Sequence, residues 1–118
     1  MKKYNIQNYI RYKNDVANSI YKLPEVENND YTIYNREQMI TCFIPLVENL
    51  ARKFSTSQQA SGVMTIMDLI QEGCAGLTQA VDRLDYKTLS ESEDQEKTLK
   101  SFLSNRIRGA IRRAIDIN

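Results

Sequence analysis

Apolar residues recur every three or four positions along most of the chain, which is the spacing of amphipathic helices. Alternation of apolar and polar residues is never sustained, and only four glycines and two prolines interrupt the helical pattern. The pattern therefore predicts an all-α fold, in which a compact helical bundle follows an N-terminal helical extension. We place the extension and its connector at 1–34 and the helical domain at 35–118.

The N-terminal extension shows the weakest periodicity. A loosely amphipathic helix is expected over 4–22, and Pro24 ends it because the residue before a proline disfavours helical geometry. Residues 24–34 are largely polar, and they predict a connector without regular structure.

A second helix is expected over 36–55. Asn35 is a favourable N-cap, and Gln38 three residues later completes the sequence of a capping box. Pro45 removes one backbone hydrogen bond, so we expect a kink or a break near 41–44. The apolar stripe of this helix consists of Met39, Phe43, Leu46, Val47, Leu50, Ala51 and Phe54.

A third helix is expected to begin at Thr65, whose hydroxyl can cap it, with Asp68 in its first turn. A loop rich in turn-forming residues precedes it at 55–63. Gly73 and Gly76 are unusual inside a helix and indicate the close approach of another backbone. Its core face consists of Ile66, Leu69, Ile70, Cys74, Leu77, Ala80, Val81 and Leu84, and its polar face of Asp68, Gln71, Glu72, Thr78, Gln79 and Asp82.

The last helix is expected over 97–116, after an acidic run at 90–96 that predicts a solvated, mobile loop. The chain as a whole is nearly neutral, with a formal net charge of +1, yet this helix is strongly basic. Such segregation favours an anionic partner, most commonly nucleic acid. Its apolar stripe consists of Leu99, Leu103, Ile107, Ala110, Ile111, Ala114 and Ile115, and its basic residues are Lys97, Lys100, Arg106, Arg108, Arg112 and Arg113.

Composition narrows the chemistry that the chain can perform. It contains no histidine, which excludes Ser-His-Asp and Cys-His catalysis and metal ligation by imidazole. Cys42 and Cys74 are too few for a disulfide framework and lack the spacing of a zinc site, so we interpret them as buried reduced thiols. The sequence shows neither a membrane span nor a signal peptide, and we expect a soluble cytoplasmic protein.

Four ordered blocks of sequence carry a resemblance to a known family. The most specific is Asp68-Leu-Ile-Gln-Glu-Gly73, and Ile44-Pro-Leu-Val-Glu-Asn-Leu-Ala-Arg-Lys-Phe54 precedes it. Gly76-Leu-Thr-Gln-Ala-Val-Asp-Arg-Leu-Asp85 and Ile107-Arg-Gly-Ala-Ile-Arg-Arg-Ala-Ile115 follow it. Together these blocks, which span roughly residues 36–116, resemble region 2 of the sigma-70 family of bacterial transcription initiation factors.

The resemblance implies a protein partner for the third helix. In the sigma-70 family the polar face of the motif helix binds the clamp helices of the RNA polymerase β′ subunit. The implied polymerase-binding residues are Asp68, Gln71, Glu72, Thr78 and Gln79. Carboxylates and amides on one helical face suit arginines of a partner coiled coil. The alternative interpretation is that they only cap the helix and form its solvated face.

The resemblance also implies a DNA partner for the last helix, namely single-stranded and duplex promoter DNA around the −10 element. Asn105 and Arg106 take the places of two tryptophans of the family, and Phe102 takes that of a tyrosine. Stacking of a base on an aromatic ring contributes about 1–3 kcal/mol. Because the two tryptophans are absent, we expect weaker promoter melting or a change in which bases are bound. Core packing is the alternative interpretation of Phe102. The implied DNA-binding residues are Lys100, Phe102, Asn105, Arg106, Arg108, Arg112 and Arg113.

The resemblance as a whole implies a promoter-specificity subunit of a bacterial-type polymerase, acting in the cytoplasm of a bacterial host cell. It implies no catalytic residue, no metal, no cofactor and no membrane partner. The departures from the family pattern and the small size are similar to divergent phage-encoded sigma factors for late genes. Two alternatives stay open: a sigma-like polymerase-binding modulator that lacks promoter melting, and a helical DNA-binding module that never binds polymerase.

Overall fold

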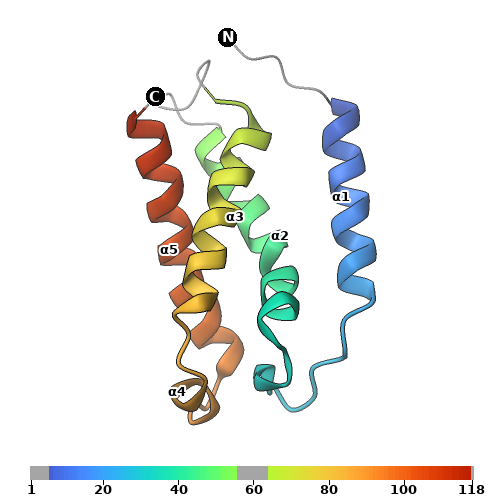
Figure 1. The fold of residues 1–118 in the computed structure, drawn as a ribbon, viewed down its shortest axis with the longest axis vertical. Coiled ribbons are helices and arrows are strands. Elements are labelled where there is room, and N and C mark those ends of the chain that lie inside the picture. Colours follow the sequence, from blue (N-terminus) through green and yellow to red (C-terminus); the bar gives the residue numbers. More distant parts are fainter. Residues whose placement is uncertain (1–5, 56–63, 118) are drawn as a thin grey trace.

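Three long helices, α2, α3 and α5, pack along one another, and α1 lies against α2 on the opposite side of the bundle from α5 (Figure 1). The computed structural model describes residues 6–55 and 64–117, and no strand occurs within these ranges. The predicted all-α fold is therefore confirmed. The elements are α1 (Ile6–Tyr21), the 3₁₀ helix η1 (Tyr31–Ile33), α2 (Arg36–Ser55), α3 (Ile66–Asp82), α4 (Tyr86–Ser90) and α5 (Gln95–Ile117).

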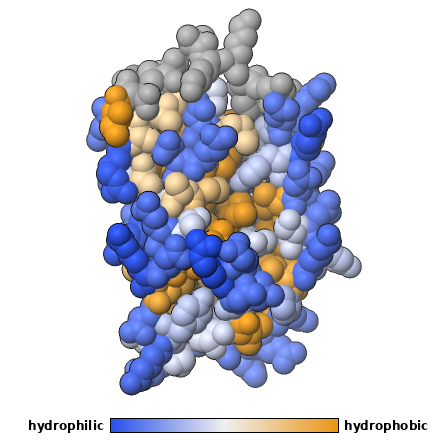
Figure 2. All heavy atoms as spheres, viewed as in Figure 1, coloured by the Kyte–Doolittle hydropathy of each residue, from blue (hydrophilic) through white to orange (hydrophobic). Residues whose placement is uncertain are grey.

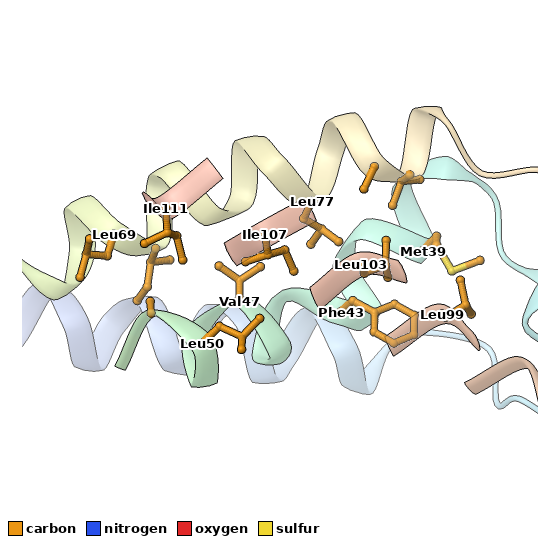
Figure 3. Packing of buried hydrophobic residues seen from close by; sticks show 14 of the residues in the cluster. Met39, Phe43, Val47, Leu50, Leu69, Leu77, Leu99, Leu103, Ile107 and Ile111 are labelled. Carbon is orange, nitrogen blue, oxygen red and sulfur yellow. The ribbon is translucent and has the colours of Figure 1, made fainter. Parts of the chain in front are cut away.

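The core forms where the apolar stripes of α2, α3 and α5 meet. Val47, Leu77 and Ile107, one from each helix, are fully buried and point toward one another between the helices (Figure 3). Burying a side chain of this size contributes about 1.5–3 kcal/mol. The other fully buried large side chains, all on predicted stripes, are Met39, Leu69, Ile70, Leu99, Leu103 and Ile111.

Two predicted helix starts are confirmed by reciprocal hydrogen bonds. At α2 the Gln38 N–H donates to Asn35 Oδ1 (2.9 Å), and the Asn35 N–H donates to Gln38 Oε1 (3.0 Å). At α3 the Asp68 N–H donates to Thr65 Oγ1 (3.1 Å), and the Thr65 N–H donates to Asp68 Oδ2 (2.9 Å). Each capping box satisfies backbone donors that a helix start leaves unpaired.

The two glycines of α3 allow neighbouring helices to approach closely, as the sequence predicts. A Cβ at Gly76 would lie 2.6 Å from the Cβ of Ala110 on α5 and 3.1 Å from the carbonyl oxygen of Arg106. A Cβ at Gly73 would lie 2.7 Å from Cγ1 of Val47 on α2. Alanine therefore does not fit at Gly76 unless the two helices move apart.

The predicted break at Pro45 is absent, because α2 is continuous through it, and a kink there stays a prediction. An interior proline costs about 3 kcal/mol through its missing N–H and its clash with an earlier carbonyl. Pro45 is exposed, whereas Phe43 and Val47 on either side of it are buried. Packing of this apolar face against the other helices offsets the local cost.

The acidic run at 90–96 is a short, largely exposed link between two helices, in which only residues 91–94 are non-helical; its mobility stays a prediction. Asp85 caps a short helix, α4, by accepting hydrogen bonds from the backbone N–H groups of Lys87 and Thr88. The last helix begins at Gln95, two residues earlier than predicted, and Asp94 Oδ1 accepts from the Lys97 N–H (3.1 Å). Acidic residues stabilise the start of a helix, and Asp94 and Glu96 of this run stand at the start of α5.

The connector is also more ordered than its polarity predicts. Tyr34 is buried in the main core, and its hydroxyl donates to the Pro24 carbonyl (2.7 Å). The Tyr31 ring lies 5.8 Å from the Phe43 ring, measured between centroids, and so joins η1 to α2. Aromatic rings, together with Val26, therefore pack a segment that is otherwise largely hydrophilic.

Several further expectations can be compared with the described residues. Cys42 and Cys74 are free thiols that are half-buried, and this burial raises the pKa of each. The predicted loop at 55–63 falls mostly outside the described residues. Among the helices that are described, none combines the length and the apolar character needed to cross a membrane.

Candidate functional site

The predicted polymerase-binding residues of α3 fall into two groups. Gln71, Glu72 and Gln79 are exposed and available to a partner. Asp68 is partly buried and serves in the capping box, and the Thr78 hydroxyl donates to the Cys74 carbonyl (2.9 Å). Asp68 therefore caps α3, and its contact with polymerase stays a prediction, while the exposed residues form a surface on which a partner could bind.

Glu72 and Gln79 lie beside α5 and not on a separate face of the bundle. They line a groove of about 340 Å³ between α3 and α5, and Arg113 lines the same groove. Gln71 and Thr78 lie outside this lining. The view in Figure 2 shows weakly hydrophobic surface in the region between α3 and the C-terminal half of α5. The rest of the lining is small or apolar: Ala75, Gly76, Ala110, Ala114 and Ile117.

Three arginines converge on an adjoining hollow of about 320 Å³ between the same helices. Arg106 and Arg113 come from α5, and Arg83 comes from the C-cap of α3. Gly109 lines the bottom of this hollow and leaves it open because it has no side chain. A Cβ there would have only Arg113 Nη1 nearby, at 3.4 Å. No carboxylate lines this hollow, and within residues 6–55 and 64–117 none of the three forms an ion pair. Its chemistry suits an anion.

Arg83, which lines this hollow, was not predicted as a site residue from the sequence. It lies between Asp82 and Asp85, and this acidic context masks its charge. Its spacing from Gly76 was the available signal, because seven residues are close to two helical turns and place both on one side of α3.

Phe102 combines the two interpretations that the sequence left open. Its side chain is half-buried against the core, and it lines an apolar hollow of about 220 Å³ with Leu84, Leu89 and Leu99. The Arg106 guanidinium carbon lies 5.3 Å from the centre of its ring, which is a cation–π distance. Phe102 is therefore a core-edge residue that remains partly open to solvent.

The other predicted DNA-binding residues lie on the opposite flank of α5. Lys100 and Arg108 line a shallow depression of about 510 Å³, in which Lys100 Nζ pairs with Glu96 Oε1 (2.9 Å). The Arg112 guanidinium lies over the Phe54 ring at 5.8 Å. Asn105 lines this depression as well as the arginine hollow. The predicted residues thus occupy two flanks of one helix.

The site offers groups that can bind charged and aromatic partners. Within the part of the chain that the structure describes, no three acidic, cysteine or histidine side chains gather to hold a metal ion. What the two helices present is a carboxylate and an amide at one groove, three arginines in the next, and a partly exposed aromatic ring beside them.

Comparison with known families agrees with this arrangement. Residues 39–116 match the family model of sigma-70 region 2, which accounts for more than half of the chain. The chain therefore belongs to the sigma-70 region 2 family, whose members are transcription initiation factors that bind RNA polymerase, recognise promoters and are not enzymes. No curated protein and no solved structure gives a significant match. Helix α1, the connector and η1 precede the matched residues.

Proposed function

We propose that this chain is a promoter-specificity subunit that binds the β′ clamp helices of a bacterial-type RNA polymerase and recognises and opens a −10-like element. The observation that carries the proposal is the meeting of α3 and α5. Their shared boundary presents Glu72 and Gln79 at one groove and three arginines at the next. One surface can therefore receive a protein helix and a nucleic-acid strand side by side.

The polymerase contact rests on the exposed residues of α3. Glu72 can accept two hydrogen bonds from an arginine of a partner helix, and Gln71 and Gln79 can donate or accept beside it. The small side chains between α3 and α5 allow a partner helix to approach closely. Asp68 contributes by holding the start of α3, through the bonds that it makes to Thr65.

The single-stranded DNA contact rests on the flank of α5 that faces α3. Arg83, Arg106 and Arg113 can hold backbone phosphates, since their hollow contains no competing carboxylate. Phe102 offers the exposed part of its ring to a base, and Arg106 extends that platform with a planar cation. Lys100, Arg108 and Arg112, with Asn105 between the two flanks, would follow the backbone of the adjoining duplex.

A polymerase-binding modulator without melting activity is the second candidate. The observation that favours it is Arg106 in the place of a family tryptophan, with its guanidinium over the ring of Phe102. Open-complex formation on promoter templates separates the two candidates. A subunit that melts DNA loses this signal with Phe102→Ala and keeps duplex binding, whereas a modulator gives no such signal in any variant.

The proposal is tested by measuring affinity for bacterial core polymerase and for −10-like promoter DNA with the same variants. Reversing the charge in Glu72→Lys, or replacing Gln71 with alanine, should weaken polymerase binding, by about 2–5 kcal/mol if the partner charge is left buried. Arg113→Ala should weaken DNA binding and reduce the salt dependence by about one phosphate contact. If it instead relaxes preference at one base pair, Arg113 reads a base.

Matched controls carry the same charge changes elsewhere on the molecule. Glu93→Lys, before α5, should leave polymerase affinity unchanged, and Arg11→Ala, on the far side of the bundle, should leave DNA affinity unchanged. Leu77→Ala, in the core, should lower the free energy of unfolding by about 2–5 kcal/mol. Its affinities for polymerase and DNA then show how much binding is lost when the fold is destabilised. Wild-type polymerase affinity in both α3 variants would exclude the docking surface. A chain that binds DNA but never polymerase would be a plain DNA-binding module.

A further inference from the structure

The connector before α2 reaches the start of α5, although the two segments are about 65 residues apart in sequence. Asn29 makes two hydrogen bonds there. Its Nδ2 donates to Asp94 Oδ1 (3.0 Å), and its Oδ1 accepts from the Glu96 backbone N–H (3.2 Å). The first N–H groups of a helix have no partner within the helix, so Asn29 supplies from afar one of the partners that α5 lacks.

Gln95 strengthens the same junction from the opposite side. Its side chain is buried, with 7% of its surface exposed, and its Oε1 accepts from the Tyr31 backbone N–H (2.7 Å). Its Nε2 lies 3.5 Å from Asp30 Oδ1. Buried amides need such partners, because each unpaired polar group costs about 1–3 kcal/mol.

The connector holds an unusual backbone shape to make these bonds. Asn28 and Asn29 have φ values of 55° and 57°, and within the described ranges they are the non-glycine residues with positive φ. Asparagine tolerates this left-handed region better than most residues, but still at a cost. Tyr31 then anchors the connector to α2 through its contact with Phe43.

We propose that Asn29 and Gln95 are positioning residues, which fix the point at which α5 begins and thereby the placement of its DNA-contacting side chains. The inference rests on the proposed DNA-binding role of α5. Lys100 and Phe102 follow within about two turns of the junction. Loss of the junction loosens the first turn, in which Glu96 pairs with Lys100, and lets Phe102 leave its half-buried position. The segment that precedes the family match is then part of the DNA-binding unit.

The experiment compares Asn29→Gly with Asn28→Gly in the full chain. Glycine accepts the left-handed backbone at either position, so strain is not introduced. Only the first variant removes side-chain bonds to α5, since Asn28 makes none to the described residues. The readouts are amide hydrogen exchange over residues 95–99, affinity for a single-stranded −10-like oligonucleotide, and affinity for core polymerase.

For Asn29→Gly we expect exchange over 95–99 to be about fivefold faster than in Asn28→Gly, the size of effect expected on losing a helix cap. Oligonucleotide affinity should fall severalfold, while polymerase affinity and the global melting temperature match those of Asn28→Gly. Gln95→Leu, which leaves the Tyr31 N–H without its acceptor, should change exchange in the same direction.

Each other outcome has a separate meaning. Equal exchange in the two glycine variants would overturn the positioning role, whatever happens to DNA binding. If Asn29→Gly exchanges faster than Asn28→Gly but binds the oligonucleotide equally well, Asn29 only stabilises the start of α5 and does not affect DNA binding. This result would also overturn the positioning role. If the wild-type chain binds no promoter DNA while exchange responds as expected, the proposed function fails and the junction between connector and α5 stands.

Discussion

The contact between α3 and α5 and the contact between α1 and α2 differ in kind. At Gly76 the backbone of α3 lies close to the Ala110 side chain and the Arg106 carbonyl oxygen of α5, and fully buried aliphatic side chains surround the crossing. Helix α1 contacts the bundle through the partly buried rings of Tyr9 and Tyr12 and is joined to α2 by polar groups. Tyr9 donates to Glu48 Oε1 (2.6 Å) and accepts from Arg52, and Lys13 lies 3.5 Å from the same carboxylate oxygen.

The difference shows which part of the molecule must keep its geometry. Binding groups from two helices can act together only if the helices keep a fixed separation. The close contact at Gly76 fixes the separation of α3 and α5. No residue of α1 lines the two grooves between α3 and α5, and each hydrogen bond that joins α1 to α2 contributes about 0.5–1.5 kcal/mol. The closest contact between helices therefore lies where the proposed polymerase and DNA contacts meet, and we expect α1 to open locally more readily than α3 or α5.

Gly76→Ala is expected to give the largest effect, because its new Cβ would lie 2.6 Å from the Cβ of Ala110. Overpacking of this kind costs about 1–3 kcal/mol, which outweighs the gain in helix propensity. Denaturant unfolding measures the loss. Gly109→Ala is the matched control, since its Cβ meets only a flexible guanidinium, and it should leave stability equal or higher. Equal stability in both variants would show that the α3–α5 contact is not tight.

Tyr9→Phe is expected to act on α1 alone. Removing the hydroxyl leaves Glu48 with its Lys13 and Arg52 partners, so the loss should be about 1 kcal/mol. Hydrogen exchange should quicken within α1 and remain unchanged in α3 and α5. Tyr21→Phe, at a side chain that is 90% exposed, is the control and should change neither. A uniform increase across all helices would mean that α1 unfolds together with the bundle.

Acid is expected to have the smallest effect, and to act at helix ends and not on the α3–α5 contact. Hydrogen bonds from the Lys97 N–H and from Asn29 lower the pKa of Asp94, and bonds from Thr88 lower that of Asp85. A lowered pKa in the folded state means that the stabilisation is present above the unfolded value, near 4, and is lost as pH falls through the folded value.

The measurement is thermal unfolding between pH 7 and pH 2. Stability should decline below about pH 4, and Asp94→Asn should reduce the decline because asparagine can still cap a helix but does not ionise. The same decline in this variant would show that other carboxylates are responsible.

Sequence was most informative where the signals are local. The spacing of apolar residues and the capping residues Asn35 and Thr65 placed α2 and α3 within about a residue of their observed starts. The start of α5 was not predictable in this way, because an acidic run resembles a solvated loop until a residue as distant as Asn29 is known to bind it. A hydrogen bond between residues so far apart in the chain produces no periodic pattern in the sequence.

The sequence could propose site residues, whose roles stay predictions, but it could not predict how they are arranged. Helical spacing assigned Glu72 and Gln79 to a polar face and the arginines to another helix, but the angle at which α3 crosses α5 decides that they adjoin. Arg83 was missed for the same reason. Its role depends on which side of α5 lies opposite it, and that is a property of packing and not of the sequence around it.

The crossing of Gly76 and Ala110 also restricts how this chain can change through evolution. A larger residue at either position forces the helices apart, and that separates Glu72 and Gln79 from Arg106 and Arg113 at once. Substitutions at Lys100, Arg108 or Arg112, on the flank of α5 away from Gly76, do not carry this packing penalty. The strength of the proposed duplex contact can therefore change more easily than the geometry of the groove.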